Sequence, residues 1–185
     1  MTKDIKVIIN IIKTDFDKDK LHRIRVNALR LENTEVISEC YKRLIDLCST
    51  TKELIALRKK YPPQSEDDSM AIWNRRVKFL TDMLDAKSDL EIGFCILIIE
   101  YEDTLEHKNQ RKTLATYTRR GASEHGIKDY LIHLMKRPET YGFKVLEEDN
   151  KLRDSFENLI IRHKKEFCED IVKMARAKLT VVELD

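Results

Sequence analysis

Apolar residues recur with the period of an α-helix along most of this chain. Two stripes of this kind follow each other between residues 18 and 48, interrupted only by Asn33 and Thr34, which can end one helix and cap the next. The first stripe is Leu21, Ile24, Ala28 and Leu31, and the second is Val36, Ile37, Cys40, Tyr41, Leu44, Ile45 and Cys48. The pattern predicts a helical hairpin over about 18–48 with a very short connection.

Further stripes predict helices in the rest of the chain. A short helix over about 51–60 ends at Tyr61, before two prolines. The next apolar face is Met70, Trp73, Val77, Leu80 and Leu84, and this spacing predicts that Trp73 is a core anchor. Residues 89–106 predict a second long helix, which is apolar on all sides over 92–99 and therefore buried. A β-strand remains the alternative over 92–99 and over 5–12.

The composition favours an all-α fold. With 4 glycines and 3 prolines in 185 residues, the chain has few of the residues that turns between strands need. We expect a compact bundle or irregular array of about eight or nine helices, with a helix-turn-helix-like element near 107–137. Six residues on the apolar stripes should be mostly buried: Trp73, Leu80, Phe94, Leu97, Leu131 and Leu159.

Residues 61–69, YPPQSEDDS, are the one clear linker in the sequence. They contain two prolines and three acids but no aliphatic side chain. The linker predicts an N-terminal helical hairpin region, residues 1–60, and a main helical domain, residues 70–185. A single continuous domain over 1–185, with 61–69 as a surface loop, is the equal alternative.

The net charge of +2 hides an uneven distribution of charged residues. Residues 1–60 carry a net +5, residues 61–106 a net −7, residues 107–137 a net +6 and residues 138–185 a net −2. The block 107–137 is the strongest local excess of cations. Such a block is typical of a polyanion-binding surface or of a solvated helix face.

In a helix across 107–120, the cations of this block fall on one face. The stripe consists of Lys108, Arg111, Lys112 and Arg119, and Arg120 follows it. Leu114 and Tyr117 lie on another face, which predicts contact with the core. Gly121 is expected to end the helix as a left-handed C-cap, so that a second helix follows after a short turn.

These features predict a cytoplasmic nucleic-acid-binding protein with a regulatory or accessory role, in which a basic helix contacts phosphates. DNA is the expected partner before RNA. A second basic stripe on the helix over 18–31 includes Arg23 and Arg30. The predicted nucleic-acid-binding residues are Lys108, Arg111, Lys112, Arg119, Arg120, Arg23 and Arg30.

Two other functions stay open. The acidic block 61–106 and the basic block 107–137 could be complementary surfaces of a helical interaction adaptor or homo-oligomer. Glu100 and Asp103, close to Glu106 and His107, could hold a divalent cation in a metal-dependent nuclease. The sequence contains no zinc-ligand spacing, nucleophile motif or phosphate-binding glycine loop. We therefore expect binding rather than catalysis, with no cofactor, no metal site and no catalytic residues.

The sequence has no feature that indicates secretion or a membrane span. No cleavage site follows the apolar patch within residues 1–15. The longest apolar run, 92–99, has 8 residues, well short of the roughly 20 that span a bilayer. The four cysteines, Cys40, Cys48, Cys95 and Cys168, form no CxxC pair. Free thiols suit a reducing compartment, so we expect a cytoplasmic location and no membrane contact.

Overall fold

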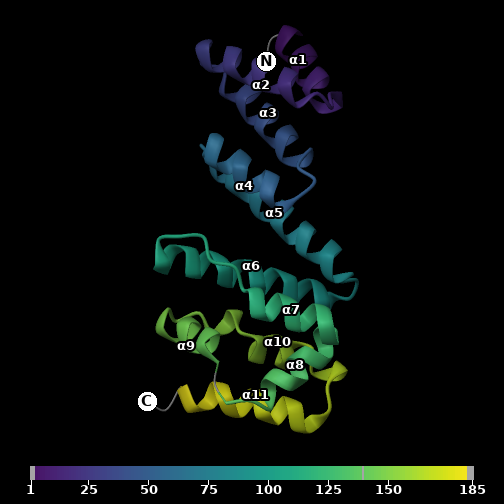
Figure 1. Ribbon diagram of the computed structural model, residues 1–185, viewed down its shortest axis with the longest axis vertical. Helices are drawn as coiled ribbons and strands as arrows, with labels where there is room; N and C mark the ends of the chain where they lie inside the picture. The colour runs from purple at the N-terminus through teal and green to yellow at the C-terminus, as the bar shows by residue number, and fades with distance from the viewer. Residues whose placement is uncertain (1–2, 139, 183–185) are drawn as a thin grey trace. The chain divides into compact units, whose positions relative to one another are not determined.

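All regular structure in this protein is helical in the computed structural model, which describes residues 3–138 and 140–182 (Figure 1). The predicted all-α class is confirmed, and the strand alternatives over 5–12 and 92–99 are wrong. The described residues form eleven α-helices and two short 3-10 helices instead of the eight or nine expected. None of the helices in this part of the chain is long and apolar enough to cross a membrane.

The chain divides into two compact units, Met1–Phe79 and Leu80–Asp185. Unit 1 contains α1 (Lys3–Thr14), α2 (Lys18–Arg30), α3 (Thr34–Asp46), α4 (Thr51–Lys60) and most of α5 (Glu66–Leu84). Unit 2 contains the end of α5, then α6 (Asp89–Asn109), α7 (Thr116–His125), α8 (Ile127–Met135), α9 (Tyr141–Glu148), η1 (Leu152–Asp154), α10 (Phe156–Arg162), η2 (Lys164–Glu166) and α11 (Glu169–Val182). The boundary lies inside α5, and separate domains over 1–60 and 70–185 stay a prediction.

The hairpin of α2 and α3 forms the centre of unit 1, which confirms the prediction for 18–48. Asp17 caps α2 by accepting hydrogen bonds from the backbone N–H groups of Asp19 and Lys20. Asn33 caps α3 by accepting from the N–H of Val36 over 3.1 Å. Helices α1 and α2 both pack on α3. The core of the unit consists of Ile12, Leu21, Ala28, Val36, Ile37, Cys40, Tyr41, Leu44, Ile45, Cys48, Leu54, Leu57 and Ile72.

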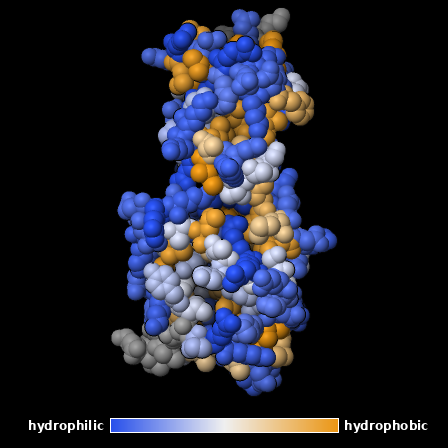
Figure 2. All heavy atoms as spheres, in the orientation of Figure 1, coloured by the Kyte–Doolittle hydropathy of each residue, from blue (hydrophilic) through white to orange (hydrophobic). Residues whose placement is uncertain are grey.

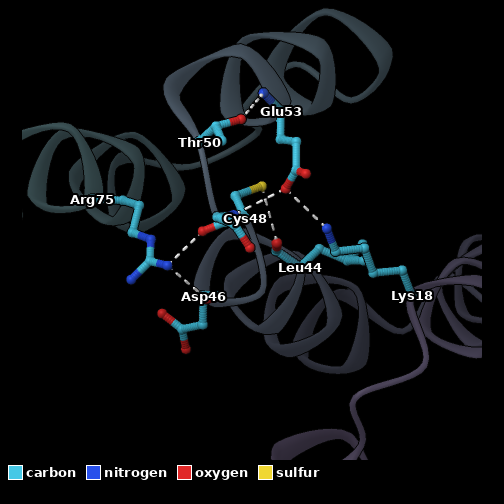
Figure 3. A network of polar contacts seen from close by, with 8 residues as sticks. Lys18, Leu44, Asp46, Cys48, Thr50, Glu53 and Arg75 are labelled. Atoms are coloured by element: carbon cyan, nitrogen blue, oxygen red, sulfur yellow. Dashed lines mark hydrogen bonds and ion pairs between the residues drawn. The ribbon is translucent and has the colours of Figure 1, made fainter. Parts of the chain in front are cut away.

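A network of polar contacts fixes the turn between α3 and α4 (Figure 3). Arg75 of α5 donates to two carbonyl oxygens near the end of α3, those of Asp46 and Cys48. On the other side of the turn, the Glu53 carboxylate accepts from Lys18 of α2 over 3.0 Å. Carbonyl groups at a helix end lack partners within the helix, so this arginine has a structural role in unit 1.

α5 buries a different face in unit 1 from the one predicted. Asp68 and Ile72 are buried, whereas Met70 is exposed. Trp73 is mostly but not fully buried, which agrees with the burial predicted for it. The hydroxyl of Ser38 donates to Asp68 over 3.1 Å, and this contact turns the face of Asp68 and Ile72 toward α3.

α6 is the central helix of unit 2, as its apolar run predicts. It packs against α8 and α10, and α11 packs against the same two helices. The buried ring of Phe94 stacks on Phe156, with 5.0 Å between centroids, and meets the ring of Tyr130 edge-on at 6.1 Å. The five other predicted core residues are buried and thus confirmed: Leu80, Phe94, Leu97, Leu131 and Leu159.

A tight helix pair follows α6, but its turn comes five residues later than predicted. Gly121 lies inside α7, where the ring of Tyr130 occupies the space that a Cβ would need. The chain turns at Gly126, whose φ is +80°, and α8 begins at the next residue. The expected C-cap at Gly121 is therefore wrong, although a short-turn helix pair is present over 116–135.

Three of the four thiols should be unreactive in the native protein. Cys40, Cys48 and Cys95 are buried and Cys168 is exposed. Burial raises the pKa of Cys40 to about 11, that of Cys95 to about 12, and also that of Cys48, so these three stay protonated at pH 8. With a chromogenic disulfide reagent we expect one fast-reacting thiol in the native protein and all four after unfolding. A second fast thiol in the native Cys168→Ser variant would contradict this packing.

Candidate functional site

The basic block does not form one helical face. α6 ends at Asn109, Gln110 takes a left-handed conformation with φ of 50°, and α7 begins at Thr116. The continuous helix expected over 107–120 is therefore wrong. Its interruption has a tertiary cause: a carboxylate oxygen of the buried Glu102 accepts the backbone N–H of Ala115 over 2.9 Å. This contact fixes the chain just before α7 and leaves 110–115 as a loop.

Arg119 pairs with Glu102 inside unit 2. Its Nε lies 2.7 Å from Oε1 and its Nη2 lies 2.8 Å from Oε2, which is bidentate geometry. Glu102 is 1% exposed and the Arg119 side chain is 17% exposed. This guanidinium points into the protein and is not part of an exposed cationic stripe. The pair also joins the acidic block 61–106 to the basic block 107–137 within one chain, which reduces the charge left for an oligomer contact.

Lys108 and Arg120 also have partners nearby. Lys108 forms an ion pair with Glu148 of α9 and donates a hydrogen bond to its carboxylate. This hydrogen bond raises the pKa of Lys108. Arg120 lies 4.0 Å from Glu124, and its guanidinium lies over the ring of Tyr117 at 5.4 Å. Because the Arg120 side chain is mostly exposed, its ion pair contributes little to stability, and the group stays accessible to an anion.

The other predicted cations are exposed and belong to two different units. Arg111 and Lys112 lie in the loop 110–115 of unit 2, whereas Arg23 and Arg30 lie on α2 of unit 1. The five predicted residues of unit 2 therefore share a segment of chain but not a helix face. Their contact with nucleic acid stays a prediction, and Arg111, Lys112 and Arg120 are the members best placed to make it.

A cleft of about 410 Å³ in unit 2 includes part of this loop in its lining. We call it the tyrosine cleft, because four of the six tyrosines of the sequence line it: Tyr101, Tyr117, Tyr130 and Tyr141. The rest of the lining comes from α6, α8, α9 and α10 and from residues 113–118. Its volume is in the range of small-molecule sites, and it is large enough for a nucleobase with its sugar.

Two of the four tyrosines are presented to solvent. Tyr117 is 81% exposed in the first turn of α7, and Tyr141 is 66% exposed at the first residue of α9. The prediction that Leu114 and Tyr117 hold a helix to the core is wrong, since both are exposed. They are exposed because residues 110–115 form a loop and not a helix. Leu114 and Tyr117 therefore do not share the helix face that the periodicity predicted.

Tyr101 lies deeper in the cleft, against α9. A Cβ on Gly142 would lie 3.2 Å from both the Cζ and the Oη of Tyr101, so the glycine allows this ring to approach the helix backbone. Burial raises the pKa of Tyr101, and the neighbouring Tyr141 adds to the shift. The Tyr101 hydroxyl is therefore protonated at neutral pH and can donate a hydrogen bond.

Polar groups of several kinds accompany the tyrosines. Arg137, between α8 and α9, lines the cleft together with the carboxylates of Asp154 and Glu157. Glu157 is buried, and a carboxylate oxygen lies 3.9 Å from Nζ of Lys178. Four threonines complete the lining: Thr113, Thr116, Thr118 and Thr140. The cleft thus offers flat apolar surfaces, a cation and both donors and acceptors of hydrogen bonds.

A second cavity of unit 2, of about 360 Å³, collects acidic residues. Glu100, Asp103 and His107 of α6 line it together with Asp149 and Asp154. Burial raises the pKa of Glu100, and so do the neighbouring carboxylates of Asp154 and Asp103. In the part of the chain that the structure describes, no three His, Cys, Asp or Glu side chains are placed to hold a metal ion. The nuclease alternative gains no support from this cavity.

Comparisons with protein-family models, with curated proteins and with solved structures find no match for this chain. The functional conclusion therefore depends on geometry. The sequence analysis did not predict the tyrosine cleft, because its residues come from six elements that only the fold brings together. One signal was available: four of six tyrosines fall between residues 101 and 141, interspersed with threonines and cations.

Proposed function

We propose that this protein binds single-stranded nucleic acid at the tyrosine cleft of unit 2. The observation that carries the proposal is the pair of exposed tyrosines, Tyr117 and Tyr141, at a cleft that also presents an arginine and several hydroxyl groups. Proteins that bind single strands combine aromatic side chains, on which bases stack, with cations that follow the phosphate backbone.

Each group of the cleft has a role in this proposal. Bases stack on the rings of Tyr117 and Tyr141, because an exposed aromatic ring offers a face to any base. Phosphates contact Arg137 in the cleft and, outside its lining, the exposed Arg111 and Arg120. The threonine hydroxyls of the lining add donors to phosphate and sugar oxygens. Acceptors in the cleft favour bases that carry an amino group.

A single strand suits these groups better than a duplex. A helix in a major groove needs several cations on one face, but Lys108 is paired with Glu148 and Arg119 is buried against Glu102. Arg111 lies exposed in a loop and Arg120 lies exposed beside an aromatic ring, where a flexible strand can reach both. DNA, expected from the sequence before RNA, is the first nucleic acid to test.

The double substitution Tyr117→Ala and Tyr141→Ala should weaken binding of a single-stranded oligonucleotide of about 15 bases at least tenfold. Each stacked base contributes about 1–3 kcal/mol, and both rings are removed. The matched control is Tyr117→Phe with Tyr141→Phe, which keeps both rings and should bind within about threefold of wild type. Fluorescence anisotropy at several salt concentrations measures both variants on DNA, RNA and duplex.

Unchanged binding by the alanine variant would show that another surface is used, and preference for duplex would exclude this mode of recognition. Both variants should keep the wild-type unfolding midpoint, because exposed side chains contribute little to stability. Circular dichroism during thermal unfolding provides this control.

A protein partner is the second candidate function, favoured by an exposed apolar face in unit 1. Val7, Ile8 and Ile11 of α1 are all partly open to solvent, and Figure 2 shows apolar side chains reaching the surface of this unit among hydrophilic ones. Residues 1–79 carry 17 basic and 12 acidic side chains, so the fitting partner is an apolar helix with acidic flanks. Such a partner would bind without nucleic acid, and the double substitution Ile8→Ser and Ile11→Ser would abolish its binding.

A further inference from the structure

Arg25 is buried inside unit 1, and no carboxylate among the described residues pairs with it. It is 4% exposed and lies on the core-facing side of α2. Its guanidinium carbon lies 4.2 Å from the ring centroid of Tyr61 and 5.9 Å from that of Tyr41. No acid in the described part of the chain forms an ion pair with it, and its enclosed Nε has no hydrogen-bond partner there. Contacts with aromatic rings compensate a buried cation only in part.

Two further buried polar atoms next to Arg25 lack partners among the described residues. They are Nδ1 of His22 and the hydroxyl oxygen of Tyr41. The ring of His22 lies 5.1 Å from that of Tyr61, so His22, Arg25, Tyr41 and Tyr61 form one contiguous cluster. We call it the Arg25 cluster. Each unpartnered group can donate a hydrogen bond: a guanidinium N–H, a phenol O–H and an imidazole N–H.

More cations than carboxylates act on His22 and Tyr41, two members of the Arg25 cluster. Burial lowers the pKa of His22, and Lys60, Arg25 and Lys18 lower it further, while Asp19 opposes them. Asp68 is the acid near Tyr41, but its two carboxylate oxygens already accept from Ser38 and from the backbone of Gln64. The carboxylate nearest to Tyr41 is therefore engaged by donors outside the Arg25 cluster.

We infer that unit 1 contains a binding site for one oxyanion, a phosphate or carboxylate group of a small molecule, formed by Arg25, His22 and Tyr41. A buried charge without a partner is strongly destabilising, and a paired one is not. An oxyanion would accept from all three unpartnered donors and neutralise the guanidinium, whose planar fork matches both chemical groups. His22 and Tyr61 are only half-buried, so the bound oxyanion would lie just below the surface of unit 1. This site is separate from the tyrosine cleft and does not depend on the proposed function.

Thermal unfolding of the full chain in inorganic phosphate, acetate or chloride at constant ionic strength tests the site. We expect phosphate, acetate or both to raise the Tm in a saturable way, by about 3 °C or more at roughly ten times the Kd, and chloride to leave it unchanged. A response to phosphate alone identifies a phosphate site, and a response to acetate alone identifies a carboxylate site. No saturable response to either anion overturns the inference.

Three variants assign the effect to the Arg25 cluster. Arg25→Met should abolish the anion response and, without anion, keep or raise the Tm, because an apolar side chain of similar length removes an uncompensated charge. Tyr41→Phe keeps the ring, loses one donor and should weaken anion affinity about five- to tenfold. Arg23→Gln, an exposed cation on the same helix, is the matched control and should respond like wild type.

The variants also distinguish a ligand site from a purely structural arginine. If Arg25→Met unfolds at a much lower temperature than wild type, the tyrosine rings alone hold Arg25 and the inference is overturned. It is also overturned if Tyr41→Phe keeps full anion affinity or if Arg23→Gln loses as much as Arg25→Met does. Wild-type anion affinity in Arg23→Gln together with the weakened affinity of Tyr41→Phe supports the site.

Discussion

Replacing Arg119 by methionine lowers the free energy of unfolding by about 3–5 kcal/mol. The substitution leaves the buried Glu102 carboxylate without its bidentate guanidinium, and breaking one side of a buried ion pair costs this much because a charge remains in a poorly solvated place. It also disturbs the anchor of the loop 110–115, since the same carboxylate holds the Ala115 N–H. Urea unfolding followed by circular dichroism measures the loss.

The neighbouring Arg120 provides the control for this prediction. Its side chain is mostly exposed, so Arg120→Met should change stability by no more than about 0.5 kcal/mol. Equal effects of the two substitutions would contradict the pairing of Arg119 with Glu102. The double substitution Glu102→Leu with Arg119→Met should recover much of the lost stability, because no unpaired charge then stays buried.

Replacing Gly121 by alanine destabilises the protein by about 1–3 kcal/mol. Alanine in the middle of a helix is normally better than glycine by roughly 0.5–1 kcal/mol, so the expected sign is reversed here. The reason is space: a Cβ at this position would lie 2.3 Å from Cε2 and 2.6 Å from Cδ2 of the buried Tyr130 ring. Crowding of this kind in a packed core costs about 1–3 kcal/mol, and urea unfolding detects it.

A second substitution tests whether Tyr130 causes the effect. In a Tyr130→Leu background the six-membered ring is gone, and Gly121→Ala should then become neutral or stabilising. The difference between the two backgrounds is the coupling energy of the pair. A stabilising Gly121→Ala in the wild-type background would show that α7 and α8 pack less tightly than the Gly121–Tyr130 distances imply.

The sequence predicted those helices whose apolar stripe and capping residue agree. In α2 and α3, the stripes from Leu21 and Val36 follow Asp17 and Asn33, and the structure has helices over 18–30 and 34–46. Most of the apolar run over 92–99 likewise became the buried centre of α6, although Ile92 is exposed. In these segments local periodicity and burial require the same conformation, so no tertiary information is needed.

The prediction of a continuous helix through the basic block failed because a tertiary contact determines the local structure there. The sequence from 107 to 115 contains no glycine or proline that would predict a break. Gln110 nevertheless has a left-handed conformation. The break follows from the hold of Glu102 on Ala115, thirteen residues later in the chain. The prediction of a C-cap at Gly121 failed for a related reason. The glycine is needed inside α7 because the Tyr130 ring of the next helix packs against it.

The loop between α6 and α7 marks a position where this chain can accept additional sequence. Both of its ends are fixed independently: the Gln110 side-chain amide donates to the carbonyl of His107 over 2.7 Å, and the Ala115 N–H is held by Glu102. Residues added between these anchors disturb neither, and each doubling of a flexible loop costs only about 0.6 kcal/mol. A peptide tag or an entire folded domain inserted after Lys112 would therefore leave the core of unit 2 intact. It would also place the inserted sequence next to the tyrosine cleft.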